Sequence, residues 1–157
     1  MSTTGEAVAR IGFFRPPLVY LASILIGLGL HWAVPLPMTA ARWPALWGAA
    51  LVASSLLLFG YAVKLFRAAG TPVPARKPTT AIVTTGPYRF TRNPIYLAFS
   101  LLQLGLALLV GSWWLLATLV LAFALMHWIV VPREERYLEA RFGDEYRRYK
   151  ASVRRWL

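Results

Sequence analysis

A short polar segment, residues 86–96, combines residue types that suit an anionic ligand. It reads Gly-Pro-Tyr-Arg-Phe-Thr-Arg-Asn-Pro-Ile-Tyr and runs directly into an apolar stretch. Asn93 followed by Pro94 is typical of a helix start, with Asn as the N-cap and Pro in the first turn. The free N–H groups at a helix start favour a carboxylate or phosphate. Arg89 and Arg92 would lie beside this position.

The alternative for this segment is purely structural. Asn93 and Pro94 would then serve only to begin a helix, and the two arginines would be charges that flank a membrane-spanning helix on its cytoplasmic side. Which interpretation holds depends on the residues that meet this segment from elsewhere in the chain.

A second polar group follows the last apolar stretch of the chain. Glu134 and Glu135 are adjacent on an expected helix, so their side chains point about 100° apart and should have different roles. His127 shares a face with Glu134 if the helix continues past Pro132, where it can kink. The alternative is that the glutamates pair with nearby arginines and that His127 is a buried or interfacial histidine.

Four apolar stretches are predicted to position these residues as membrane-spanning helices: 18–34, 45–63, 95–110 and 113–131. Only Gly111 and Ser112 separate the last two, which must therefore form an antiparallel hairpin. The hairpin returns the end of the fourth helix to the end at which the third begins. We therefore expect the glutamates to lie near Arg92.

Composition and charge agree with a membrane protein. Of the 157 residues, 58% are hydrophobic and 15% charged, and the mean hydropathy is +0.54. Six of the 17 lysines and arginines lie in residues 64–93 and eight in residues 132–157, which predicts a cytoplasmic loop, a cytoplasmic tail and a cytoplasmic N-terminus. The sequence thus predicts one all-α integral membrane domain over residues 1–157.

The tail is predicted to end in an amphipathic helix that begins at Asp144 and carries Tyr146, Tyr149, Val153 and Trp156 on one face. Arginines and a lysine surround this face, so we expect the helix to lie on anionic lipid. Lipid headgroups also explain the net charge of +11 better than nucleic acid does, because the basic residues flank apolar stretches. The absence of Cys, with only two His, excludes disulfides and an ordinary catalytic zinc site.

Several motifs occur together in a distinctive order. They are Gly70-Thr71-Pro72-Val73, Thr85-Gly86-Pro87-Tyr88-Arg89, Thr91-Arg92-Asn93-Pro94-Ile95-Tyr96, Glu134-Glu135 and Phe142-Gly143-x-x-Tyr146-x-x-Tyr149. In combination, over roughly residues 64–157, they resemble the isoprenylcysteine carboxyl methyltransferase and phospholipid methyltransferase superfamily of integral membrane enzymes. The resemblance implies binding of S-adenosyl-L-methionine (SAM) on the cytoplasmic side and entry of the methyl acceptor from the bilayer.

The resemblance also implies the site residues. Arg92, Glu134 and Glu135 would be catalytic, and no metal is expected. The SAM-binding residues expected from the motifs are Gly86, Tyr88, Arg89, Arg92, Asn93, Pro94, Tyr96, Glu134 and Glu135, and His127 is added because it would share a helix face with Glu134. Many members carry His where this chain has Asn93, and Asn cannot titrate near neutral pH, so a proton-transfer role is not expected at this position.

The residue types suit SAM on chemical grounds as well. Arg92 and the helix start suit its carboxylate, a glutamate suits its ammonium group or ribose diol, and Tyr88 or Tyr96 suits its adenine ring or sulfonium. Methyl transfer is an in-line displacement that needs alignment rather than an enzyme nucleophile. An amine acceptor would need a base, whereas a carboxylate would not. The glycine-rich turn of soluble methyltransferases is missing, so a SAM site here would be built from helices and loop.

Two other functions stay open at this stage. One is an NADPH-dependent reductase, because the membrane sterol reductases resemble this superfamily in their C-terminal halves. The other is a non-catalytic lipid-binding membrane protein, which would bind neither cofactor. The expected partners are membrane lipids and a lipid-like acceptor of unspecified identity, and the expected location is a prokaryotic cytoplasmic membrane. The oligomeric state is left open.

Overall fold

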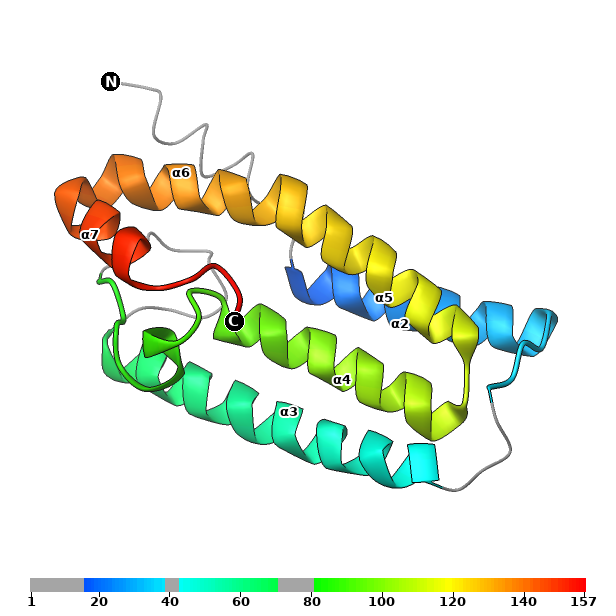
Figure 1. Cartoon of the computed structure of the whole chain (residues 1–157). Helices are drawn as coiled ribbons and strands as arrows, with labels where there is room; N and C mark the ends of the chain where they lie inside the picture. The colour runs from blue at the N-terminus through cyan, green and yellow to red at the C-terminus, as the bar shows by residue number, and fades with distance from the viewer. Residues whose placement is uncertain (1–15, 39–42, 71–80) are drawn as a thin grey trace.

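A computed structural model describes residues 16–38, 43–70 and 81–157, and these form helices with no β-strand (Figure 1). The bundle consists of α2 (Pro16–Ala33), α3 (Trp43–Ala68), α4 (Pro94–Val110) and α5 (Trp113–Leu125). A 3₁₀ helix, η1 (Gly86–Arg89), precedes α4. A π-helical turn, η2 (Met126–Val130), joins α5 to α6 (Val131–Phe142), and α7 (Asp144–Ser152) follows.

Three helical segments are long and apolar enough to cross a membrane: Pro16–Ala33, Pro44–Ala68 and Trp113–Phe142. The apolar helix α4, with 17 residues, is shorter. Helices suit the bilayer because their backbone groups are hydrogen-bonded internally. Leu57 and Leu121 are 76% and 69% exposed, as expected of side chains that face lipid. The prediction of an all-α integral membrane protein is confirmed, although α3 extends past residue 63 to Ala68.

The four long helices run antiparallel to their chain neighbours (Figure 1). Helix α3 packs along α4, α2 packs along α5, and the α4–α5 hairpin joins the two pairs. Gly111 makes the tight turn of the hairpin with a positive φ of 66°, which favours glycine. The start of α2, the end of α3, the start of α4 and helices α6 and α7 therefore lie at one end of the molecule (Figure 1).

Small and polar side chains fix the helices within the apolar part. A Cβ atom added to Gly105 would lie 2.8 Å from the carbonyl oxygen of Gly48, so glycine allows α3 and α4 to approach closely. Gln103, which is fully buried, joins α4 to α2 and α5. Its amide nitrogen donates to Ser23 Oγ at 2.7 Å and to Thr118 Oγ1 at 3.1 Å.

The π-helical turn carries the helix across Pro132. Proline has no N–H group, so the regular bond to the carbonyl four residues earlier cannot form. Just before it, the N–H of Val131 donates to the carbonyl of Met126, five residues earlier, and the helix continues as α6. The wider turn shifts the register of the residues that follow, and Glu135 is left only 5% exposed.

Candidate functional site

The segment before α4 folds against α3. Gly86 has a φ of 59°, and a Cβ atom added there would lie 2.5 Å from Leu65 Cδ1, so this position requires glycine. Helix α4 begins at Pro94 with Asn93 as its N-cap residue, as predicted. The Asn93 side chain, however, makes no capping bond and instead donates to the carbonyl oxygen of Arg155 at 2.9 Å.

Glu135 is held between two arginines from distant parts of the chain. Nη1 of Arg92 lies 3.1 Å from Glu135 Oε1 in an ion pair. Arg155 donates to both carboxylate oxygens, from Nε at 2.9 Å and from Nη2 at 2.7 Å. This two-pronged geometry is the strongest form of arginine–carboxylate pairing. The bonds to Glu135 are also the main cause that raises the pKa of Arg155.

Glu134 has a different partner. The Tyr96 hydroxyl lies 2.7 and 2.9 Å from its two carboxylate oxygens and donates to them. The bond connects the first turn of α4 to the first turn of α6. The two adjacent glutamates therefore have separate partners, as their angular separation predicts.

Two tyrosines of α7, in the C-terminal tail, form part of the wall of the site. Tyr146 and Tyr149 are 2% and 9% exposed, and the Tyr149 hydroxyl donates to the Tyr88 carbonyl oxygen at 2.8 Å. Burial raises the pKa of the Tyr146 hydroxyl, with a further contribution from Glu135. The helix is shorter than predicted, because it ends at Ser152 and leaves Val153 and Trp156 beyond it, and its two tyrosines are buried against protein.

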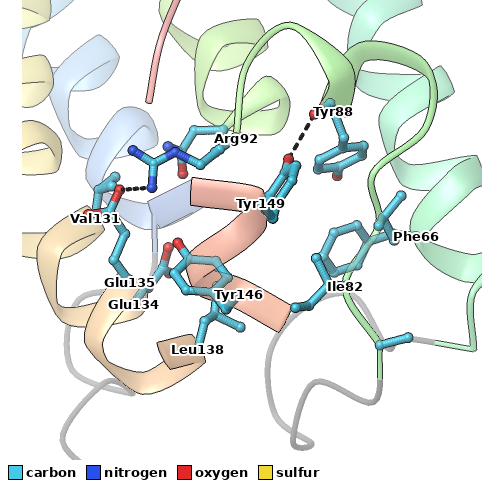
Figure 2. A pocket seen from close by; sticks show the side chains of 13 residues that line it. Phe66, Ile82, Tyr88, Arg92, Val131, Glu134, Glu135, Leu138, Tyr146 and Tyr149 are labelled. Atoms are coloured by element: carbon cyan, nitrogen blue, oxygen red, sulfur yellow. Dashed lines mark hydrogen bonds and ion pairs between the residues drawn. The ribbon is translucent and has the colours of Figure 1, made fainter. Parts of the chain in front are cut away.

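These side chains surround one pocket at the end of the bundle (Figure 2). Arg92 and Glu135 lie on one side of it, Tyr88 and Phe66 on the other, and Tyr146 and Tyr149 between them (Figure 2). The complete lining is Phe66, Ala81, Ile82, Val83, Tyr88, Arg92, Asn93, Val131, Glu134, Glu135, Leu138, Tyr146 and Tyr149. The pocket thus has a charged wall formed by the motif and α6, and an apolar wall that includes α3.

The predicted site residues fall into two groups. Five line the pocket: Tyr88, Arg92, Asn93, Glu134 and Glu135. The other five lie outside its described wall. Gly86, in η1, packs against α3, Arg89 lies in an open hollow beside α7, and Pro94 is buried at the start of α4. Tyr96 lies behind Glu134, and His127 Nδ1 accepts a 2.8 Å bond from the Trp156 indole.

Sequence reasoning missed several residues of the site. Phe66, Ile82 and Leu138 are ordinary apolar residues, and nothing in their local sequence separates them from core residues. The three-residue spacing of Tyr146 and Tyr149 predicts that they share a helix face but not what this face contacts. Arg155 lies in an irregular segment, where neither a helical periodicity nor a sequence motif indicates which residue it contacts.

Comparisons with known proteins relate the chain to methyltransferases and to metal-resistance proteins. It is 34% identical over 147 residues to the cobalt-zinc-cadmium resistance protein CzcN of Cupriavidus metallidurans, an alignment that covers 88% of this chain and 60% of that protein. It is 34% identical over 74 residues to the protein-S-isoprenylcysteine O-methyltransferase of Schizosaccharomyces pombe, covering 46% of this chain and 30% of that enzyme. The chain therefore spans less than two thirds of either relative.

A shorter relative and a family profile complete the comparison. An uncharacterized protein of Haemophilus influenzae is 41% identical over 63 residues, which is 40% of this chain and all of that protein. No solved structure matches significantly. The profile described as phospholipid methyltransferase matches residues 43–145, which include α3, the motif before α4 and both glutamates. The resemblance inferred from the motifs is confirmed, and the chain belongs to the phospholipid methyltransferase family.

Proposed function

We propose that this protein transfers a methyl group from SAM to a lipid or lipid-like acceptor at the cytoplasmic face of a prokaryotic membrane, with both chain ends cytoplasmic. The observation that carries the proposal is the meeting of Arg92, Glu134 and Tyr88 in one pocket at the end of a membrane-spanning bundle. Membership of the phospholipid methyltransferase family supports the reaction class. The concentration of lysines and arginines in residues 64–93 and 132–157 supports the cytoplasmic face.

Unpartnered donors in the pocket fit the polar groups of SAM. Within the described residues, Nε of Arg92 and the Tyr88 hydroxyl are buried and make no hydrogen bond, and Nη1 of Arg92 has only its ion pair with Glu135. Buried donors normally have partners, so the Arg92 Nε–H and the Tyr88 hydroxyl suit a ligand that brings acceptors. A guanidinium group suits the ligand's carboxylate, and a tyrosine hydroxyl suits its ribose or adenine acceptors.

Glu134 is the better placed of the two carboxylates for contact with a ligand. Glu135 already faces two guanidinium groups, which neutralise it, whereas the described partner of Glu134 is the neutral Tyr96 hydroxyl. Glu134 therefore keeps lone pairs that are free to accept from a ligand. We propose that Glu134 binds the ligand's ammonium group or its ribose diol. If the acceptor is an amine, Glu134 would accept the proton that the amine must lose.

The remaining chemistry is alignment. SAM, when bound, supplies a methyl group activated by the adjacent sulfonium. Arg92 and Glu134 would orient the cofactor from the polar wall, and the burial of the Arg92 side chain, which is 10% exposed, would strengthen its contacts. Phe66, Val131 and Leu138 give the pocket an apolar side, which suits an acceptor with a hydrocarbon chain.

Transfer of labelled methyl groups tests the proposal. Purified protein in nanodiscs is incubated with methyl-labelled SAM and a bacterial lipid extract, and label in the lipid fraction is measured. We expect incorporation by the wild type, a loss of at least tenfold in Glu134→Gln, and unchanged incorporation in Glu139→Gln, whose carboxylate pairs with Lys150 away from the pocket. Incorporation unaffected by Glu134→Gln would overturn the assigned role, and no SAM-dependent label in any lipid fraction would count against the lipid acceptor.

A further inference from the structure

The last residues of the chain turn back across the start of α4. This C-terminal strap, residues 153–157, leaves α7 and ends beside the first turn of α4 (Figure 1). The backbone N–H of Arg92 donates to the Arg154 carbonyl oxygen at 2.9 Å. The Thr91 hydroxyl and the Asn93 amide donate to the Arg155 carbonyl oxygen at 3.1 and 2.9 Å. Three consecutive residues of the motif are thus bonded to the strap.

Side chains hold the strap at two further points. The Trp156 indole donates to His127 Nδ1 at 2.8 Å and packs against Phe123, with ring centroids 4.7 Å apart. One residue earlier, Arg155 holds both oxygens of Glu135. The strap therefore connects α5, the π-helical turn, α6 and the motif, all of which contribute to the site or adjoin it.

Arg155 reaches Glu135 from outside the pocket. Glu135 and Arg92 belong to the pocket wall, whereas the described lining does not include Arg155. The Glu135 side chain is 7% exposed and that of Arg155 29%. Arg155 is thus placed to fix the carboxylate from behind without occupying the space that a ligand would use.

We propose that Arg155 is a positioning residue of this site. By fixing Glu135 it fixes the partner of Arg92, and the carbonyl groups of the strap hold the backbone of the same arginine. The Arg92 guanidinium is thereby kept facing the pocket. Arg155 also cancels the charge of Glu135, which leaves Glu134 as the pocket carboxylate that acts on the ligand. The inference rests on the proposed function for the identity of that ligand, whereas the positioning itself is testable without one.

The ligand-free test uses hydrogen exchange. In nanodisc-held protein, NMR follows exchange of the Trp156 indole N–H and the Arg92 amide. We expect Arg155→Ala to raise both exchange rates at least tenfold. Arg154→Ala should leave both rates within twofold of wild type, because Arg154 bonds to Arg92 through its backbone carbonyl and its side chain is exposed. Equal protection in Arg155→Ala and wild type would overturn the proposed positioning.

The ligand test measures SAM affinity in the same variants. We expect Arg155→Ala to bind SAM at least fivefold more weakly, Arg155→Lys to recover part of the loss, and Arg154→Ala to bind like wild type. In a Glu135→Gln background, Arg155→Ala should add less than a twofold effect, because the ionic partner is already gone. Wild-type affinity in a folded Arg155→Ala protein would overturn the positioning role. No SAM binding by the wild type would instead overturn the proposed function, and the exchange result would then decide the role of Arg155 alone.

Discussion

The Tyr96 hydroxyl and the Glu134 carboxylate, 38 residues apart in the chain, are joined by contacts of 2.7 and 2.9 Å. The α4–α5 hairpin brings them together, because it returns the chain to the end of the bundle where α4 begins. Tyr96 thereby supports, from behind, the carboxylate to which we assign contact with the ligand.

Removing this hydroxyl should destabilise the protein measurably. Tyr96→Phe leaves Glu134 without its described partner, and leaving a buried acceptor without its partner costs about 1–3 kcal/mol. We expect the free energy of unfolding to fall by that amount in a denaturant titration in mixed micelles. Tyr61→Phe, at a tyrosine that is 52% exposed, should change it by less than about 0.5 kcal/mol. Equal effects of the two substitutions would argue against the bond.

The two adjacent glutamates should differ in their contribution to stability. Glu135→Ala leaves Arg92 and Arg155 without their shared carboxylate, and the loss of one partner of a buried ion pair costs about 3–5 kcal/mol. Glu134→Ala removes one hydrogen-bond partner and should cost about 1–3 kcal/mol. Glu139→Ala, which breaks a surface pair, should cost less than about 1 kcal/mol. Unfolding free energies that reverse the order of Glu134 and Glu135 would contradict the assignment of Glu135 as the anchored carboxylate.

The close packing of α3 against α4 should not tolerate even one additional methyl group. Gly105→Ala places Cβ 2.8 Å from the Gly48 carbonyl oxygen, so we expect a loss of about 1–3 kcal/mol in unfolding free energy. Gly29→Ala is the matched control, because no atom outside the adjacent backbone of its own helix lies within 4 Å of the added Cβ. The control should be neutral or stabilising by up to about 1 kcal/mol. A neutral Gly105→Ala would show that the two helices are not in close contact there.

The buried amide of Gln103 should contribute through bonds between helices. Gln103→Leu keeps a similar volume but removes the bonds to Ser23 and Thr118. Because hydrogen bonds between membrane helices contribute about 0.6 kcal/mol on average and at most about 1.7 each, we expect a loss of about 1–2 kcal/mol. The same unfolding titration measures this loss of stability, and Ser54→Ala, at an exposed position, is the control. A Gln103→Leu protein as stable as wild type would contradict this role.

Local sequence signals were sufficient to predict the helices. They also predicted that the motif before α4 lies near Glu134 and Glu135. Asn93 and Pro94 predicted the start of α4, and Gly111 with Ser112 predicted the hairpin. These signals act over a few residues, so they can be read without knowledge of the fold. The convergence of Arg92 with the glutamates followed from them by topology alone.

Contacts that depend on tertiary packing were not predictable in the same way. The seven-residue spacing of His127 and Glu134 implied a shared face, but the π-helical turn between them changes the register. Asn93 had the sequence of a capping residue, yet the strap offers its side chain the Arg155 carbonyl instead. The periodicity of α7 identified its apolar face, whereas only the folded chain shows that this face covers the site.

Binding of SAM tests the central claim most directly. The titration follows heat on addition of SAM to nanodisc-held protein, for wild type, Arg92→Ala, Glu134→Ala and the control Arg154→Ala, whose exposed side chain lies outside the pocket. We predict saturable binding by the wild type and by Arg154→Ala, and a weakening of at least tenfold, about 1.4 kcal/mol, in the other two. No binding by folded wild-type protein, or equal affinity in Arg92→Ala, would contradict the account.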